Sequence, residues 1–459
     1  MKRWTDLQKK WPEIVKIALI NLVFLAIFIE LGAAALYWSK HKQLFYTRSE
    51  NQTNEAIAQL GLPINPTTTD ATILERLHPF FGYVLKPNLP FNLEFSNRVF
   101  TINNFGFPAD YDYPFIRQNP NQVIIGVFGG SVASNLAMYE IEHQVLAKTL
   151  QENIPELANK EIIILPLALG GYKQPQQLLI LNYLLSLGQE FDFVINIDGF
   201  NEVALSNLNY QENIALSMPS VQHLLPLRDV ASNNLGPDEL MAIANIVENR
   251  EQLRKRQEKL PESKLASTYL FRLVSTQAAA RNYQDNLMEF ERIRGQKAKN
   301  PQQDFILKIE NAREVMDTDT AFNRMAELWG NSSRLMKQSL GAQNSLYFHF
   351  IQPNQYYPTG RSFSEAERSL AIIDNHPYQV GVQQGYPVLL QTVEQLKTEN
   401  IPIFNATEIF DNVNELVYID SCCHYNQAGN QVFATYIADS IVGFLNQNPE
   451  LKNRWKSLD

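Results

Sequence analysis

The longest apolar stretch of the chain lies near its N-terminus. Residues 17–38 read IALINLVFLAIFIELGAAALYW, close to the roughly 20 residues that a helix needs to cross the hydrocarbon core of a bilayer. Basic residues are more frequent before this stretch than after it, which favours a cytoplasmic N-terminus. We therefore expect a cytoplasmic tail over residues 1–16, a transmembrane anchor over 17–38, and an extracytoplasmic, periplasmic remainder of a single-pass protein of the cell membrane.

Two features of the apolar stretch leave alternatives open. The small residues at 33–35 could form a signal-peptide cleavage site, although the long polar flank and the aromatic pair Tyr37-Trp38 favour a retained anchor. Glu30 is acidic, and an acidic group at membrane depth costs about 2.5 kcal/mol or more unless it is protonated, paired or near the interface. Glu30 either reaches the interface or is neutral, or it marks contact with a membrane protein partner.

After the anchor the pattern becomes polar and then alternates with short apolar runs. Residues 46–72 contain Pro63, Pro66 and three successive threonines, so we interpret residues 39–76 as a stem or linker. Residues 77–107 combine Phe, Val and Tyr with Pro, Gly and Asn punctuation. This composition predicts short strands and turns that pack against the domain that follows.

Five short apolar runs, each separated from the next by helical-period sequence, predict the core of that domain. They lie at residues 123–128, 161–167, 193–197, 346–351 and 401–405. Continuous apolar strands interleaved with helices are typical of an α/β fold whose parallel sheet is covered on both faces. The domain is expected to span 77–459. A polar, helix-forming stretch over 205–343 interrupts it and is interpreted as a helical insertion.

Composition narrows the class of protein. The chain has 459 residues, 45% of them hydrophobic, and a net charge of -9. A chain of this length and composition can bury a sizeable core without disulfides or a structural metal. Its negative charge is opposite to that of a nucleic-acid binder, so no nucleic acid is expected as a partner. The two cysteines are the adjacent pair Cys422 and Cys423, which excludes a disulfide scaffold. They form either a strained vicinal disulfide or two buried thiols.

The first strand-to-helix turn carries a candidate nucleophile. The chain reads VFGGSVASN there, which places Gly129, Gly130 and Ser131 just after the strand. Two glycines permit a tight turn, and a serine at a helix N-terminus lies among N–H groups that can hold an oxyanion. By itself the turn could equally hold a phosphate, although neither the dinucleotide fingerprint nor the phosphate-loop lysine pattern is present.

The ends of later strands add to this signal. Gly171 follows the second run, Asn201 follows the third, and Asp420 and His424 stand near the C-terminus in YIDSCCHYNQAGNQ. In this order, the residues resemble the SGNH or GDSL-like hydrolase superfamily, named for its serine, glycine, asparagine and histidine. The resemblance covers residues 77–445 apart from the insertion. It extends to three segments that look like those of membrane-anchored members: HPFFGYVLKPN, INNFGF and FIQPNQYYP.

The resemblance implies a flavodoxin-like three-layer α/β/α sandwich and ester chemistry through an acyl-enzyme. It also implies that Ser131 is the nucleophile, that His424 is the general base and that Asp420 orients it. The backbone N–H groups of Ser131 and Gly171 and the side chain of Asn201 would form the oxyanion hole. This division of roles fits the physical requirement, because serine is a weak nucleophile until a base takes its proton.

Two positions depart from the family pattern. Gly130 stands where the serine motif usually has an aspartate. Asp420 lies four residues before His424, whereas the family usually has three, and Ser421 occupies the expected place. A bulge through the two cysteines would restore the geometry.

Other polar residues near the strand ends have simpler explanations. Asp198 and Glu202 flank Asn201 and would either act on substrate or serve as a helix cap or loop ion pair. Gln352, Tyr356 and neighbouring residues after the fourth run would contact substrate or only pack the loop. The remaining histidines lack metal-ligand spacing, so no metal and no other cofactor is expected.

Three functions are consistent with these residues. The first is a serine esterase or deacetylase that acts on an ester-bearing envelope polysaccharide or lipid. The second is a polysaccharide O-acyltransferase that uses the same triad and is fed by a membrane partner. The third is a catalytically inactive SGNH-fold binding module. The first two differ only in the hydroxyl that attacks the acyl-enzyme, so no residue in the sequence separates them.

Overall fold

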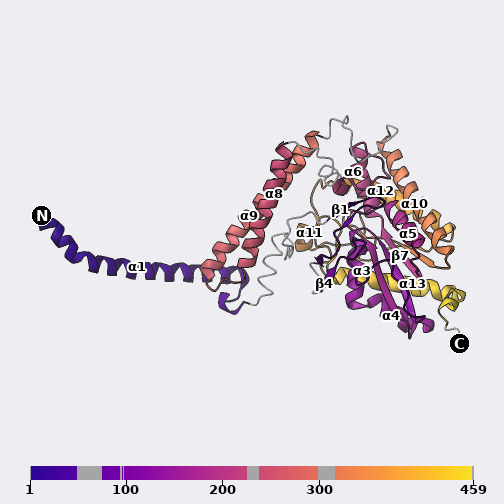
Figure 1. Cartoon of the computed structure of the whole chain (residues 1–459), viewed down its shortest axis with the longest axis horizontal. Coiled ribbons are helices and arrows are strands. Elements are labelled where there is room, and N and C mark those ends of the chain that lie inside the picture. The colour runs from indigo at the N-terminus through magenta and orange to yellow at the C-terminus, as the bar shows by residue number, and fades with distance from the viewer. Residues whose placement is uncertain are drawn as a thin grey trace. The chain divides into compact units, whose positions relative to one another are not determined.

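A computed structural model describes residues 2–48, 75–93, 96, 98–224, 237–297 and 316–456 (Figure 1). Its contacts divide the chain into two compact units. The first comprises Met1–Thr72 with Leu235–Gln303, and the second comprises Ile73–Asn234 with Asp304–Asp459. Residues 49–74, where most of the predicted stem falls, lie outside the described residues.

The first unit joins the N-terminal helix to a helical hairpin. Helix α1 spans Lys2–His41, and its segment Val15–Ser39, with a mean hydropathy of 2.4, is long and apolar enough to cross a membrane. A 3-10 turn, η1, follows at Phe45–Thr47. Helices α8 (Pro237–Lys259) and α9 (Ala266–Lys297) form the hairpin. The start of α9 packs against α1 and η1 through a small cluster of Ala33, Tyr37, Phe45, Leu260, Ala266, Tyr269 and Leu273.

The second unit is built on a five-stranded sheet whose neighbouring strands are all parallel. In spatial order β6-β5-β7-β8-β9, the strands span Glu161–Ala168, Gln122–Gly129, Phe193–Asp198, Leu346–Ile351 and Ile403–Asn405. Every residue of β5 and β7 is buried, as expected of strands covered on both faces. The five strands predicted from the apolar runs and the α/β class are confirmed.

Two groups of helices pack with this sheet. Helices α3 (Ser131–His143), α4 (Val145–Asn153) and α13 (Gln427–Gln447) form one group. The other contains α5 (Gln176–Ser186), α6 (Phe200–Gln211), α10 (Thr318–Gly341) and α12 (Gln379–Thr398). In Figure 1 the label of β7 stands between the two groups. The unit also contains short helical segments, among them η2 (Pro155–Leu157), α11 (Glu365–Ala371) and η3 (Pro449–Trp455).

Two small antiparallel ribbons precede the sheet, as the composition of 77–107 predicts. Strand β1 (Glu75–His78) pairs with β2 (Gly82–Leu85), and β3 (Pro90–Asn92) pairs with β4 (Val99–Thr101). Phe81, Tyr83 and Phe107 are buried in the core of the sheet unit. Tyr83 donates a hydrogen bond of 2.6 Å to the carbonyl of Gly170, so the ribbon supports the loop that follows β6.

The polar stretch 205–343 is divided between the two units. Its central part, α8 and α9, belongs to the first unit. Helix α10 instead belongs to the sheet unit, where Phe322, Met325 and Trp329 are buried in the core. The sequence groups these helices because all are polar on one face, whereas the packing of the apolar face separates them.

Candidate active site

The turn between β5 and α3 presents Ser131 at the carboxyl edge of the sheet. Gly129 has a φ of +144°, and a Cβ there would lie 2.0 Å from the carbonyl oxygen of Ile197, so only glycine fits. Gly130 caps α3, and a Cβ on it would lie 2.2 Å from Nδ2 of Asn201. The second glycine thus leaves room for Asn201.

Ser131, His424 and Asp420 form one continuous chain of hydrogen bonds. The Ser131 hydroxyl lies 2.7 Å from Nε2 of His424, and Nδ1 of the same ring lies 2.5 Å from Oδ2 of Asp420. These contacts correspond to a tautomer in which Nδ1–H donates to the carboxylate and Nε2 accepts from the serine. The structure therefore brings Ser131 to His424 and Asp420, which lie almost three hundred positions later in the sequence.

The four-residue spacing between Asp420 and His424 is absorbed by a tight turn. Tyr418 and Tyr425 form an antiparallel bridge across it, and Oδ1 of Asp420 accepts the backbone N–H groups of Cys422, Cys423 and His424 at 2.9, 3.0 and 3.3 Å. One carboxylate oxygen thus holds the turn while the other faces the imidazole. Burial raises the pKa of Asp420, but the hydrogen bonds and charge of His424, together with the turn amides, outweigh it and leave the pKa below its ordinary value.

Asn201, in the first turn of α6, is tied to the loop after β6 that carries Gly171. Nδ2 of Asn201 donates to the carbonyl of Tyr172 at 2.7 Å, and an amide nitrogen has a second hydrogen that can serve an oxyanion. Gly171 has a φ of +75°, and a Cβ there would lie 2.2 Å from Cδ2 of His223. Glycine is required at this position because its backbone approaches the His223 ring closely. His223 was not among the predicted site residues.

Glu202 links the segment after β6 to the segment after β7 through hydrogen bonds. Its Oε2 accepts the N–H of Gly199 at 2.7 Å, which confirms the predicted helix cap. Its Oε1 accepts the N–H of Gln174 at 3.0 Å and Nε2 of Gln177 at 3.3 Å. Burial, reinforced by the charge of Asp198, raises the pKa of Glu202 to about 8. One buried side chain therefore joins the loop after β6 to the loop after β7.

Asp198 belongs to the core. Its Oδ1 accepts hydrogen bonds of 2.7 Å from Trp329 Nε1 and from His349 Nε2, and its Oδ2 accepts one of 2.7 Å from Asn196. Ser333 lies 2.9 Å from Nδ1 of His349. All of these side chains are buried, so Asp198 and His349 have structural roles.

The loop after β8 braces the turn that carries Asp420 and His424. Nδ2 of Asn354 donates to the carbonyl of Cys422, and Nε2 of Gln355 donates to the carbonyl of Asp420, both at 3.1 Å. Tyr356 is buried. These contacts show that the loop packs against the turn, and contact of this loop with substrate stays a prediction. The bracing itself could not be read from the sequence, because both acceptors are backbone carbonyls.

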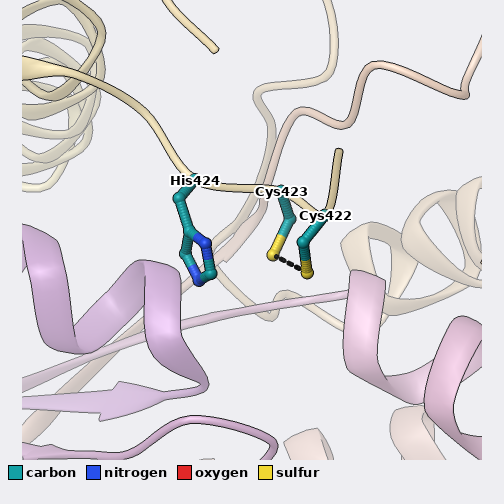
Figure 2. Close-up of side chains that lie close together, drawn as sticks. All are labelled: Cys422, Cys423 and His424. Atoms are coloured by element: carbon teal, nitrogen blue, oxygen red, sulfur yellow. Dashed lines mark hydrogen bonds between the residues drawn. The ribbon is translucent and has the colours of Figure 1, made fainter. Parts of the chain in front are cut away.

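The adjacent cysteines lie beside the imidazole (Figure 2). Both are free thiols, with sulfur atoms 3.1 Å apart. Cys423 is buried, and its sulfur lies 4.0 Å from the Ser131 hydroxyl. Burial raises the pKa of the Cys423 thiol well above its ordinary value. Cys422, Cys423 and His424 offer donor atoms within 4.8 Å of one another, but a metal there would compete with Ser131 or Asp420 for the ring nitrogens.

No family model matches the chain, and no curated protein matches it either.

Proposed function

We propose that this protein is a membrane-anchored serine esterase or deacetylase of the SGNH type. The observation that carries the proposal is the unbroken contact of Asp420, His424 and Ser131 at the carboxyl edge of a parallel sheet. The strand order β6-β5-β7-β8-β9, counted along the chain, is the 2-1-3-4-5 order of flavodoxin-like sheets. This order supports the three-layer architecture that the proposal assumes.

In the proposed reaction, His424 takes the proton of Ser131 as its hydroxyl oxygen attacks the ester carbonyl. Asp420 keeps the ring in the tautomer with Nδ1 protonated and stabilises the imidazolium that forms. The backbone N–H groups of Ser131 and Gly171 and the Asn201 amide bind the developing oxyanion. The imidazolium then protonates the leaving alcohol. Water, activated by His424, releases the acid from the acyl-enzyme in a second attack.

The proposed substrate is an ester-bearing polysaccharide or lipid of the cell envelope. Helix α1 is long and apolar enough to cross a membrane, which would confine the enzyme to a membrane surface. Because the acyl-enzyme reacts with any hydroxyl that reaches it, the same site would transfer the acyl group to a sugar if water were excluded.

The test uses the full chain in detergent with p-nitrophenyl acetate and a fluorophosphonate probe. Ser131→Ala should abolish ester cleavage and labelling. Ser134→Ala is the matched control, because it removes a hydroxyl one turn later in the same helix, and it should retain both. Acetylated and free polysaccharide in parallel reactions separate hydrolysis from transfer. Turnover by Ser131→Ala, or a folded wild type that neither turns over nor labels, would disprove the proposal.

A further inference from the structure

Glu30, in the apolar part of α1, is bound to the start of α9. Its Oε1 accepts the N–H of Ala266 at 2.6 Å, and its Oε2 accepts the N–H and the hydroxyl of Ser267 at 3.1 and 2.5 Å. Tyr46 donates a further hydrogen bond of 2.5 Å to Oε1. A carboxylate at a helix N-terminus satisfies backbone N–H groups that otherwise lack partners. Glu30 therefore fixes the start of α9 at its own level along α1.

That level lies within the membrane-spanning segment. Glu30 is nine residues before Ser39, the end of the 25-residue segment, which corresponds to about 13 Å of helix. The segment is about 7 Å longer than a 30 Å hydrocarbon core. Wherever the core lies within the segment, Glu30 is roughly 6 to 13 Å inside its boundary on the side of the helix C-terminus. Interfacial helices are buried to about 5 to 10 Å.

The exposed face of α9 changes character along its length. Near its start, Phe271 is 75% exposed and Val274 is 62% exposed, and Ala278 lies on the same face. Farther along this face come Arg281, Asn282 and Asp285, all exposed, and Met288, which is 63% exposed, lies one heptad after Arg281. Large exposed apolar side chains next to a membrane helix are typical of contact with lipid. The exposed face is therefore apolar over residues 271–278 and mainly polar from residue 281 on, as expected of a helix that leaves the apolar phase.

Backbone carbonyls in the loop before α9 accept hydrogen bonds from two arginine side chains. Arg48 donates to the carbonyls of Pro261 and Ser263, and Arg272 donates to the carbonyl of Lys259 and to the Ser263 hydroxyl. Backbone carbonyls must be satisfied internally where water is scarce. Leu265, at the end of this loop, is 51% exposed. Basic side chains in and beside this loop are Arg48, Lys259, Lys264 and Arg272, and the acidic ones are Glu258, Glu262 and Glu30.

We propose that the start of α9 is a second membrane contact, with Leu265, Phe271 and Val274 inserted among lipid acyl chains in the leaflet on the C-terminal side of α1. The long side chains of Arg48 and Lys264, beside the inserted residues, would extend toward anionic headgroups, where each charge is worth about 1 kcal/mol. This contact is independent of the ester chemistry. It would hold the start of the α8–α9 hairpin against the membrane surface.

The experiment uses the full chain in vesicles of phosphatidylcholine and phosphatidylglycerol. Cys422 and Cys423 are replaced by serine, and a single cysteine at 271 (Phe271→Cys) carries an environment-sensitive fluorophore. Asn282→Cys is the matched control, because it lies on the same exposed face about 16 Å farther along α9. Quenching is measured with doxyl-labelled lipid and with aqueous iodide.

The label at 271 should be quenched by the doxyl lipid and protected from iodide, and the label at 282 should show the reverse. Quenching of both labels by iodide alone would overturn the proposal. So would protection of 271 from both quenchers, which would indicate contact with a second copy of the chain. If the serine background fails to fold, photoactivatable phosphatidylcholine with the wild-type chain gives the same answer. Crosslinks should then map to residues 265–274, and their absence there would refute the contact.

Discussion

Asp420→Asn is the substitution that tests the candidate site most severely. The two carboxylate oxygens have different partners, since Oδ1 accepts three backbone N–H groups and Oδ2 accepts the imidazole Nδ1–H. An asparagine has only one acceptor oxygen. If that oxygen takes the place of Oδ1, the turn is preserved, but an NH2 group then faces Nδ1. The ring is forced into the tautomer with Nε2 protonated, which cannot accept the proton of Ser131.

The size of the effect follows from the contacts. The opposite orientation of the amide keeps the ring correct but gives up three hydrogen bonds at roughly 1 kcal/mol each, so it is populated at about 1% or less. This alone lowers kcat about 100-fold. Loss of the negative charge beside the imidazolium adds to it, and the corresponding change in a serine protease costs about ten-thousand-fold. We therefore expect Asp420→Asn to lower kcat by between about 100-fold and about ten-thousand-fold.

The assay is steady-state hydrolysis of p-nitrophenyl acetate by the full chain, with thermal unfolding measured on the same preparations. The fold should be retained, because the asparagine oxygen still holds the turn. Asp319→Asn is the control, since it removes an exposed charge in the first turn of α10 and should leave kcat unchanged. If Asp420→Asn kept a tenth or more of wild-type kcat while His424→Ala had none, the site would be a serine–histidine dyad.

Three further substitutions test neighbouring features. Gly130→Ala should lower kcat by about 10²- to 10³-fold, because its Cβ would displace Asn201. Gly443→Ala, with open space around it, should leave kcat unchanged. Cys423→Ala should keep ester turnover within a few-fold of wild type, and loss of turnover would implicate the thiol in the reaction. Burial raises the pKa of Glu140 from 4.5 to about 7, so the folded state binds more protons than the unfolded state in this window. Stability should fall by about 3 kcal/mol from pH 4.5 to 7, and urea unfolding of Glu140→Gln should lack this slope.

The sheet could be predicted from the sequence because its signal is local. A doubly buried parallel strand must be apolar at every position, so each strand is visible as a short run. Strand β9 begins at Ile403, two residues later than predicted. Pro402 has no N–H to donate to a strand partner, although its carbonyl still accepts a hydrogen bond of 2.9 Å from the N–H of His349.

The allocation of helices could not be predicted in this way. Helices α9 and α10 both have polar faces, and nothing in their composition says which surface each apolar face meets. Trp329 of α10 is buried where its indole donates to Asp198. Tyr269 of α9 instead packs on Tyr37 and Phe45. Such partners are set by tertiary packing, which single-sequence patterns do not record.

The candidate site likewise has one part that the sequence reveals and another part that it does not. Ser131, Asn201, Asp420 and His424 were accessible because their chemistry is in the side chains and their order is characteristic. The residues that hold them act mostly through backbone groups. Gln355, for example, reaches the carbonyl of Asp420 across 65 positions of sequence. A pattern of side chains cannot reveal a contact whose other half is a peptide bond.

Glu30 shows how a correct physical premise can still lead to an incomplete set of answers. A carboxylate in an apolar helix needs a partner, and the sequence offered only the interface, protonation or another membrane protein. The partner in the structure is the start of α9, 236 residues away in the same chain. A membrane partner is therefore not needed to explain this residue. The acyltransferase hypothesis took part of its support from such a partner, so a decision in its favour must come from the acceptor assay.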